Sequence, residues 1–176
     1  MNYLVRHAAE ADIPAMARVH VDTWKSTYRG IVPDERLDSM TYESDLARGF
    51  GSWVKQPPSG WGTLVAVREG EVVGFAGCGY SREEDREFRG ELGAIYVLKD
   101  HQGKGVGRAL VREVALHLQE LRLKTMIVWV LRDNPYRRFY EGIGGVVIRE
   151  RIAKVAGAQL PEVAYGWGDI APLTRL

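Results

Sequence analysis

Two long stretches of the chain carry apolar residues at helical spacing. The first covers 13–24, where Asp12 can cap a helix and Pro14 suits its first turn. The second begins at 106 and spaces its apolar residues by helical intervals, at Val106, Leu110, Val114, Leu118 and Leu121. Both patterns predict amphipathic helices with one buried face.

Runs rich in β-branched and aromatic residues predict the strands of a sheet. Two of these runs flank Glu69-Gly70, a pair typical of a hairpin turn. Another leads into a glycine-rich segment, and the last two are expected to form an antiparallel pair. The predicted strands cover 63–68, 71–80, 92–98, 125–131, 146–155 and 162–169.

Breaker residues and charges predict the segments between these elements. Residues 28–33 end the first helix, and the helical pieces 34–40 and 42–55 stop at a Pro-Pro pair. The charged run 82–89 is predicted to be a solvated loop.

The chain is long enough for one core and gives no sign of a second domain. It has 176 residues, of which 45% are hydrophobic and 27% charged, so a single domain over 1–176 is predicted. No run approaches the roughly 18 apolar residues of a membrane span, and residues 1–12 mix charges without an apolar signal core. We therefore expect a cytoplasmic protein without a membrane segment.

Charge, cysteine and histidine content exclude several classes of function. The net charge is +1, and basic residues are interspersed with acids, which disfavours nucleic-acid binding. The single cysteine, Cys78, allows no internal disulfide, and the four histidines lack metal-ligand spacing. We expect neither a metal ion nor nucleic acid as a partner.

The segment 102–107, Gln-Gly-Lys-Gly-Val-Gly, follows a predicted strand and opens a predicted helix. Backbone N–H groups at a helix start lack partners within the helix and favour a bound anion, so this turn can hold a phosphate. Lys104 and Arg108 either add cationic donors or are solvated charges beside an ordinary turn. The spacing matches neither a Walker A loop nor a dinucleotide fingerprint.

This loop and a second motif downstream resemble the GCN5-related N-acetyltransferase (GNAT) family. The loop reads Gln-x-x-Gly-x-Gly after the strand Glu91–Leu98, and the second motif, over 128–145, joins a strand to an Asn-headed helix and a Phe-Tyr pair before glycine. Asn134 is also expected to cap a short helix over 135–141. The match is strongest over 91–145, and the order of elements extends it to nearly the whole chain.

The resemblance implies the GNAT fold. This is an α/β (α+β type) domain with a mixed central sheet of about six or seven strands, flanked by helices, in which two central parallel strands splay apart. Backbone groups of the first of these strands then pair with coenzyme A in place of a neighbouring strand. Here those groups belong to Ile95, Tyr96 and Val97, unless the strand is fully paired. Gly93 is expected either to mark a bulge or to pack closely.

The resemblance also implies a set of residues that bind acetyl-CoA, the expected co-substrate. They lie on the strand, on the glycine-rich loop and at the start of the second motif. The set consists of Ile95, Tyr96, Val97, Gln102, Gly103, Lys104, Gly105, Val106, Gly107, Arg108 and Asn134.

Acetyl transfer to an amine needs a base for the nucleophile and an acid for the leaving thiolate. Tyr140 matches the family position of the acid, although a tyrosine after Phe139 also suits packing. Glu91, at the start of the central strand, is either the base, acting through water, or a surface glutamate. Trp24 and Tyr28, four residues apart on a helix, either line the acceptor pocket or pack in the core.

We therefore predict an acetyl-CoA-dependent N-acetyltransferase that acts on a primary amine by direct attack in a ternary complex. The acceptor is expected to be a small molecule, such as a polyamine or an amino compound, bound near 24–37 and the loop 155–161. A ping-pong route through Cys78 is disfavoured because no histidine is paired with it. The alternatives are a non-catalytic acyl-CoA sensor, a protein N-acetyltransferase and, third, a phosphate-binding domain for another nucleotide. A homodimer through the last strands is compatible with the sequence.

Overall fold

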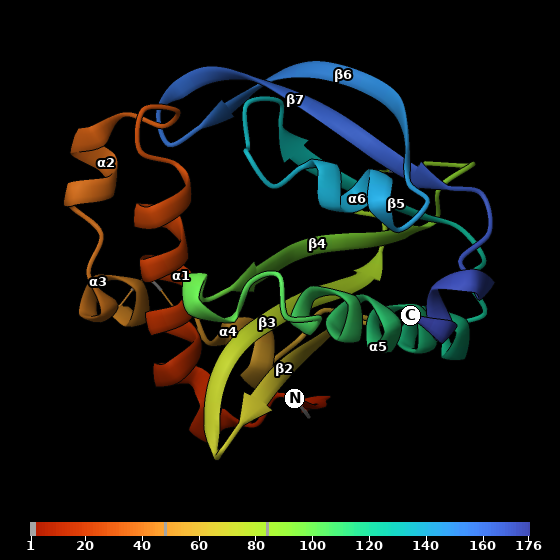
Figure 1. Ribbon diagram of the computed structural model, residues 1–176, viewed down its shortest axis with the longest axis horizontal. Coiled ribbons are helices and arrows are strands. Elements are labelled where there is room, and N and C mark those ends of the chain that lie inside the picture. The colour runs from red at the N-terminus through yellow and green to blue at the C-terminus, as the bar shows by residue number, and fades with distance from the viewer. Residues whose placement is uncertain (1–2, 48, 84) are drawn as a thin grey trace.

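One mixed β-sheet forms the centre of the molecule, and helices lie on both of its faces (Figure 1). The computed structural model describes residues 3–47, 49–83 and 85–176. Within them, seven strands follow in the order β1-β2-β3-β4-β5-β7-β6. Strands β4 and β5 are parallel, and the other neighbours are antiparallel. This is the mixed, helix-flanked sheet that the sequence predicts.

The strands are β1 (Leu4–His7), β2 (Gly62–Arg68), β3 (Glu71–Tyr80), β4 (Gly90–Val97), β5 (Met126–Leu131), β6 (Val146–Val155) and β7 (Ala158–Trp167). The helices are α1 (Ile13–Thr27), α2 (Asp34–Asp38), α3 (Tyr42–Ala47), α4 (Ser52–Lys55), α5 (Val106–Glu120) and α6 (Arg138–Gly142), with short 3₁₀ turns at Glu10–Asp12, Lys99–His101 and Ala171–Arg175. Over the described ranges, none of these helices has the length and apolar content needed to span a bilayer.

The two longest helices cover opposite faces of the sheet because successive strand residues point to opposite sides. Leu64 and Ala66 of β2 belong to the core beside α5, whereas Val65 between them packs with Met16 and Val19 of α1. The predicted stripe of α5 is buried in that core, at Val106, Leu110, Val114 and Leu118, with Leu121 partly buried against it.

Strands β4 and β5 are neighbours over a short distance only. Their register pairs are Gly90 with Met126 and Glu91 with Ile127. Beyond these pairs the two strands diverge, as Figure 1 shows. The expected splay between the central parallel strands is therefore confirmed.

Gly93 takes both of the roles expected for it. It is a bulge residue, because the pairing with β3 steps from Ala94 to Leu92 without it. It also packs closely, since a Cβ at this position would lie 2.8 Å from ring atoms of Trp61. The bulge and the indole together fix the course of β4 where the divergence begins.

Two differences from the sequence-based expectations concern the N-terminal part. Strand β1 was not predicted, because three of its four residues are exposed and the segment has no alternation of buried apolar residues. The helical piece expected over 42–55 divides into α3 and α4, with Gly49 at a φ of +77° between them. Arg48 lies outside the described residues.

Two further differences concern the C-terminal part. The loop expected over 155–161 is a tight turn, because β6 runs to Val155 and β7 already begins at Ala158. The helix expected over 135–141 begins only at Arg138. Asn134 accepts a hydrogen bond from the N–H of Tyr136 at 2.8 Å, which makes a turn before the helix rather than a helix cap.

The charged segment 82–89 is wrongly predicted as simply solvated. The Asp85 carboxylate accepts the backbone N–H groups of Glu87 and Phe88 and pairs with Arg149 of β6, so its side chain is only 5% exposed. The ring of Phe88 is buried. Glu84 of this segment lies outside the described residues.

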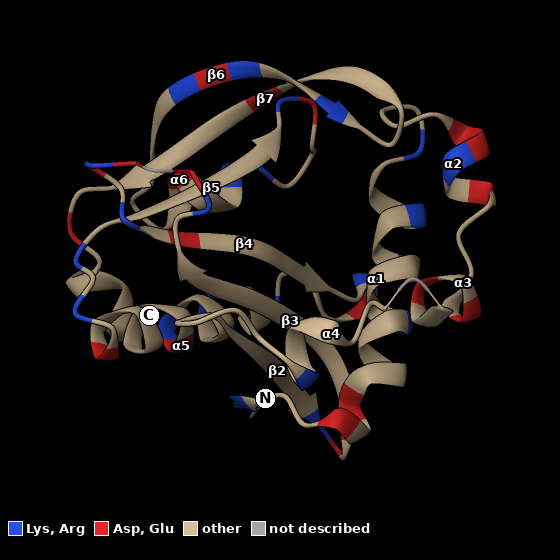
Figure 2. Cartoon of the chain, turned by 180° about the vertical axis from the view of Figure 1, so that it is seen from behind, with Lys and Arg blue, Asp and Glu red and all other residues tan. Residues whose placement is uncertain are grey.

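Charged side chains of β6 and β7 extend this contact, and Figure 2 shows the alternation of charge along β6. The guanidinium of Arg151 pairs with Glu83 and with Glu162 and lies 3.8 Å from the centroid of the Trp129 ring. These ion pairs hold the β6–β7 hairpin against the segment that precedes β4.

Candidate active site

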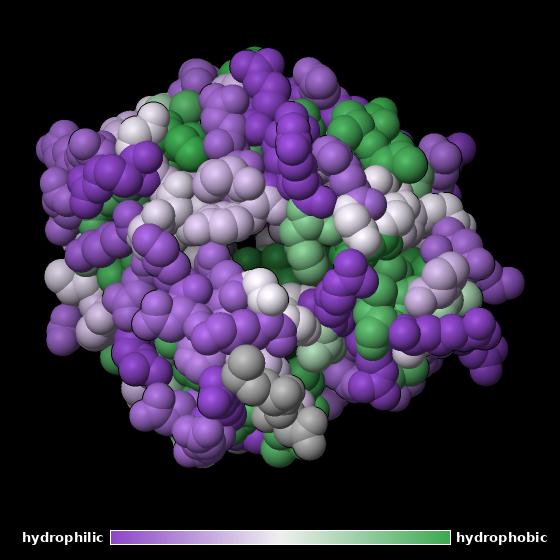
Figure 3. Space-filling view, viewed as in Figure 1, coloured by the Kyte–Doolittle hydropathy of each residue, from purple (hydrophilic) through white to green (hydrophobic). Residues whose placement is uncertain are grey.

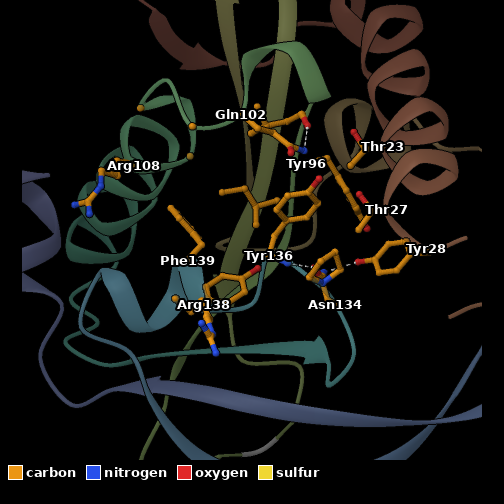
Figure 4. A pocket seen from close by; sticks show the side chains of 17 residues that line it. Thr23, Thr27, Tyr28, Tyr96, Gln102, Arg108, Asn134, Tyr136, Arg138 and Phe139 are labelled. Atoms are coloured by element: carbon orange, nitrogen blue, oxygen red, sulfur yellow. Dashed lines mark hydrogen bonds between the residues drawn. The ribbon is translucent and has the colours of Figure 1, made fainter. Parts of the chain in front are cut away.

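A cavity of about 460 Å³ opens where β4 and β5 diverge. Its walls come from the end of α1, from β4, from the glycine-rich loop with the start of α5, and from the segment 134–140. Figure 3 shows a hollow near the middle of this face with apolar surface at its bottom, and Figure 4 shows the side chains around it. Four segments far apart in the sequence therefore meet at one site.

Most of the site residues predicted from the sequence line this cavity. Lys104 and Val106 do not: Lys104 is exposed on the loop, and Val106 is buried in the core. Trp24 and Glu91 also lie outside the lining. Those that line it are Tyr28, Ile95, Tyr96, Val97, Gln102, Gly103, Gly105, Gly107, Arg108, Asn134 and Tyr140.

The β4 wall offers backbone groups without a strand partner on the cavity side. Residues Ile95–Val97 pair with β3 along one edge, but none of them has a register partner in β5. The side-chain amide of Gln102 donates to the carbonyl of Val97 at 2.9 Å and ties the loop to the strand end. Because an unpaired buried amide is costly, the remaining groups favour an extended ligand with amides of its own.

The glycine-rich loop presents open backbone at the start of α5. Gly103 and Gly105 have φ angles of +68° and +89°, and a Cβ on either would meet no atom within 4 Å. Gly105 is the residue that precedes α5, whose first N–H groups lack helical partners. Gly107 gives α6 room, because its Cβ would lie 3.2 Å from the Phe139 ring. The loop has the features of an anion cradle.

Two arginines give the cavity a positive character. Arg108 of α5 lines the cavity and donates to the carbonyl of Gly142 at 3.3 Å, and Arg138 of α6 also lines the cavity. Among the described residues that line the cavity, none is Asp, Glu or His. Guanidinium groups beside open N–H groups suit the oxygens of a phosphate or diphosphate.

Tyr140 places a phenol on the cavity wall within a cluster of aromatic rings. Its ring centroid lies 5.5 Å from that of Tyr165 and 6.4 Å from that of Trp167. Burial raises the pKa of Tyr140, and the neighbouring Tyr96 and Tyr165 add to this effect. Its hydroxyl has no hydrogen-bond partner among the described residues. Tyr140 is thus a protonated donor with an unused O–H at the cavity.

Tyr28 and Asn134 connect opposite walls of the cavity (Figure 4). The side-chain amide of Asn134 donates to the hydroxyl of Tyr28 at 3.2 Å. Burial raises the pKa of Tyr28, so its hydroxyl stays neutral. Trp24 packs against Tyr28 from outside the cavity, with ring centroids 5.0 Å apart. Of the two predicted acceptor residues, Tyr28 lines the cavity and Trp24 supports it.

Glu91 is buried on β4, four residues before Ile95, and is 3% exposed. Its carboxylate accepts the backbone N–H of Arg82 at 2.8 Å and the Nε–H at 2.9 Å, and it also pairs with a terminal guanidinium nitrogen of Arg82. The glutamate is therefore held by a neighbour in the preceding segment. It does not line the cavity.

Comparison with known proteins decides the family. Residues 21–144 match the model of the acetyltransferase (GNAT) family. The chain is 38% identical over 173 residues to the uncharacterized N-acetyltransferase YuaI of Bacillus subtilis, covering 98% of this chain and 96% of that protein. The chain belongs to the GNAT family. It is an N-acetyltransferase that uses acetyl-CoA.

Two further similarities extend over almost the whole GNAT domain. The chain is 25% identical over 171 residues to the L-amino acid N-acyltransferase MnaT of Escherichia coli, covering 97% of this chain and 90% of that protein. The structure of the PaiA N-acetyltransferase of Thermoplasma acidophilum in complex with coenzyme A superposes with a TM-score of 0.66 and 20% identity, covering 93% and 98% of the two chains. That structure shares the GNAT fold.

The described residues fit acetyl-CoA, the co-substrate of a GNAT enzyme. The open backbone at Gly103 and Gly105 and the guanidinium of Arg108 suit its diphosphate. The unpaired edge at Ile95–Val97 suits the amides of its pantetheine arm. When bound, the co-substrate supplies the acetyl thioester.

Sequence reasoning missed several residues of the GNAT cavity, above all Thr23 and Thr27 of α1 and Arg138 of α6. The threonines are four residues apart and directly precede Trp24 and Tyr28, a helical interval that is a signal for one shared face. Arg138 follows another arginine, and only the orientation of α6 decides which of them reaches the cavity.

Replacing Gly105 with leucine should weaken the binding of acetyl-CoA about tenfold or more, measured by calorimetry, because the side chain would fill the open cradle and strain a left-handed residue. Gly70→Leu is the matched control, since Gly70 has a φ of +85° and open space in the β2–β3 turn, away from the cavity. Equal affinity in both variants would remove the loop from the cofactor site.

Proposed function

We propose that this GNAT enzyme transfers the acetyl group of acetyl-CoA to a primary amine of a small molecule by direct attack in a ternary complex. One observation carries the proposal: the unused hydroxyl of Tyr140 lies on the same cavity as the open glycine loop and the unpaired edge of β4. A thioester held along β4 would thus have a proton donor on the facing wall.

The reaction needs two proton transfers, and Tyr140 serves one of them. The amine nitrogen forms a bond to the acetyl carbon, the carbon–sulfur bond breaks, and the leaving sulfur takes the phenolic proton. The amine loses a proton to a base, and that proton returns to Tyr140 through water. Since burial raises the pKa of the phenol, it holds its proton until the sulfur needs it.

Glu91 is our candidate for the base. It has no direct place on the cavity wall, so the proton must reach it through water. Its position on β4, just before the bulge at Gly93, brings the carboxylate close to the point where β4 and β5 separate. Arg82 fixes its orientation through hydrogen bonds.

Direct transfer is supported over an acyl-cysteine route. Cys78 is fully buried in the core beside α5 and does not line the cavity. Burial raises the pKa of its thiol to about 12, so that a thiolate nucleophile is absent at neutral pH.

The acceptor class is supported by the shape of the site and by one relative. The cavity has a volume suited to small molecules, and MnaT, by its name, acts on L-amino acids. A small amino compound or a polyamine is our proposal for the acceptor, and a protein amine is the alternative. Exposed Val146 and Ile152 on the edge strand β6 support a homodimer through the last strands.

The first test is release of free coenzyme A from acetyl-CoA in the presence of polyamines, amino acids, aminoglycosides and short peptides. Amine-dependent release is expected, and Cys78→Ala serves as the control that removes the protein's own thiol. Binding of acetyl-CoA without release for any acceptor would contradict the enzyme and favour a sensor that uses the same cavity.

Tyr140→Phe should lower kcat about a hundredfold and leave the affinity for acetyl-CoA unchanged, because only the acidic proton is removed. Tyr165→Phe is the control, since its hydroxyl bonds Arg137 and Glu141 instead of facing the cavity. The raised pKa also means that wild-type kcat should not decline below pH 10 through loss of the phenolic proton. Unchanged turnover in Tyr140→Phe would remove Tyr140 from the acid role.

Glu91→Gln should lower kcat about a hundredfold and leave the affinity for acetyl-CoA unchanged, because the amide cannot accept the proton. Glu87→Gln, an exposed change in the segment before β4, should leave kcat as in the wild type. A Glu91→Gln variant that loses thermal stability and keeps the wild-type kcat would limit Glu91 to holding Arg82.

A further inference from the structure

Two threonines of α1 carry buried hydroxyls that the fold leaves without a partner. Thr23 and Thr27 lie one helical turn apart on the face that lines the cavity, as Figure 4 shows. They are 6% and 8% exposed, and neither Oγ1 has a hydrogen-bond partner among the described residues. A ligand in the cavity would lie against both side chains.

These unpaired hydroxyls need an explanation, because a buried polar group without a partner lowers stability. A threonine in a helix commonly bonds the carbonyl of the preceding turn. The neighbouring Ser26 does this, and its hydroxyl donates to the carbonyl of Thr23 at 3.2 Å. The same helix thus provides a hydrogen-bond partner for the hydroxyl of the serine outside the cavity. It leaves the hydroxyls of the two threonines that line the cavity without one.

The α1 wall of the cavity has hydrogen-bonding groups that are not in use, and at least one of them is a free donor. The hydroxyl of Tyr28 already accepts from Asn134, which leaves its own proton free for a further bond. The threonine hydroxyls can donate or accept, so a ligand that completes all of these bonds brings at least one acceptor atom, for the proton of Tyr28.

The charged residues of the cavity agree with this preference. With Arg108 assigned to the diphosphate of acetyl-CoA, Arg138 is the other charged residue among the described lining residues, and no carboxylate or imidazole is among them. A polyamine, whose nitrogens are cationic donors, would meet donors and positive charge. A carboxylate or carbonyl oxygen would meet groups that can bond it.

We propose that Thr23, Thr27 and Tyr28 bind an oxygen of the acceptor, and that the preferred acceptors are amines that carry a carboxylate, such as amino acids, over polyamines. This inference rests on the proposed acetyl transfer, since it assigns the acceptor side of the same cavity. The threonines then determine the specificity for the acceptor and take no part in the proton transfers.

Matched substrate pairs test the class of acceptor. Each amino acid is compared with the amine that remains when its carboxylate is removed, so that both members share one amine and one side chain. We expect kcat/KM to be about tenfold or more higher for the amino acid of each pair. Equal or better use of the decarboxylated amines would overturn the proposal.

Thr23→Val and Thr27→Val test the residues, because valine keeps the volume of threonine and removes the hydroxyl. Each should lower kcat/KM for the amino acid about tenfold, leave the decarboxylated amine within about twofold, and leave the affinity for acetyl-CoA unchanged. Ser26→Ala on the same helix is the control and should change none of these values. Threonine replaced by serine should restore the wild-type preference.

Two readouts separate this role from a structural one. Calorimetry of the amino acid into protein saturated with coenzyme A measures acceptor binding without turnover, and both valine variants should weaken it about tenfold. Their melting temperatures should equal or exceed that of the wild type, because an unpaired buried hydroxyl is removed. A lower melting temperature in both variants would show that the hydroxyls have structural partners and would overturn the proposal.

A loss of acetyl-CoA affinity in the valine variants, with acceptor binding intact, would assign the hydroxyls to the cofactor and also overturn it. Failure of the proposed function would appear in two other measurements: the titration of the wild type with acetyl-CoA and the coenzyme A release assay. The two failures are therefore distinguishable.

Discussion

The backbone of β4 sets the central constraint of this molecule. After Glu91 the strand has no neighbour on one side, and its N–H and C=O groups from Ile95 to Val97 face a cavity instead. Such groups are costly to leave unpaired in an apolar setting. The fold satisfies one of them with the side chain of Gln102 and leaves the others to a ligand. The glycine loop, α5 and α6 are all placed around this open edge.

A strand that loses its partner must be held apart by other contacts. The segment 82–89 supplies them at the end where β4 and β5 are still paired. Thr125, just before β5, accepts the N–H of Arg89 and donates to the carbonyl of Glu87. Asp85 and Arg149 connect the same segment to β6. A run of charges that resembles a solvated loop therefore joins the two halves of the sheet.

Local patterns were sufficient to predict the elements that form the candidate cofactor half of the cavity. The glycine spacing, the apolar stripe of α5 and the strand before it are all encoded within 91–121, so that a short window predicts both the elements and their order. The splay itself came from the family resemblance, since no local pattern records which strand pairs end early. The position of the bulge at Gly93 was also open from sequence, because glycine suits bulges and close packing alike.

The rest of the candidate site could not be predicted in this way, because it depends on contacts between residues far apart in the sequence. The burial of Glu91 beside Arg82 follows from the path of the segment before β4, which the charge pattern did not reveal. Likewise, nothing in the spacing of Thr23 and Thr27 shows that their hydroxyls lack partners, since most helical threonines bond their own backbone. Strand β1 escaped prediction because an exposed edge strand needs no apolar alternation.

The strand order β5-β7-β6 has a consequence for the time at which the site is completed during synthesis. Strand β7 is made after β6 yet must insert between β6 and β5, and its Tyr165 and Trp167 form the rings against which Tyr140 packs. A nascent chain therefore acquires its glycine loop early and the support of its phenol last. Chains interrupted before 158 carry the cradle without the rings that support Tyr140, so the complete candidate site appears only in chains that have passed through the final hairpin.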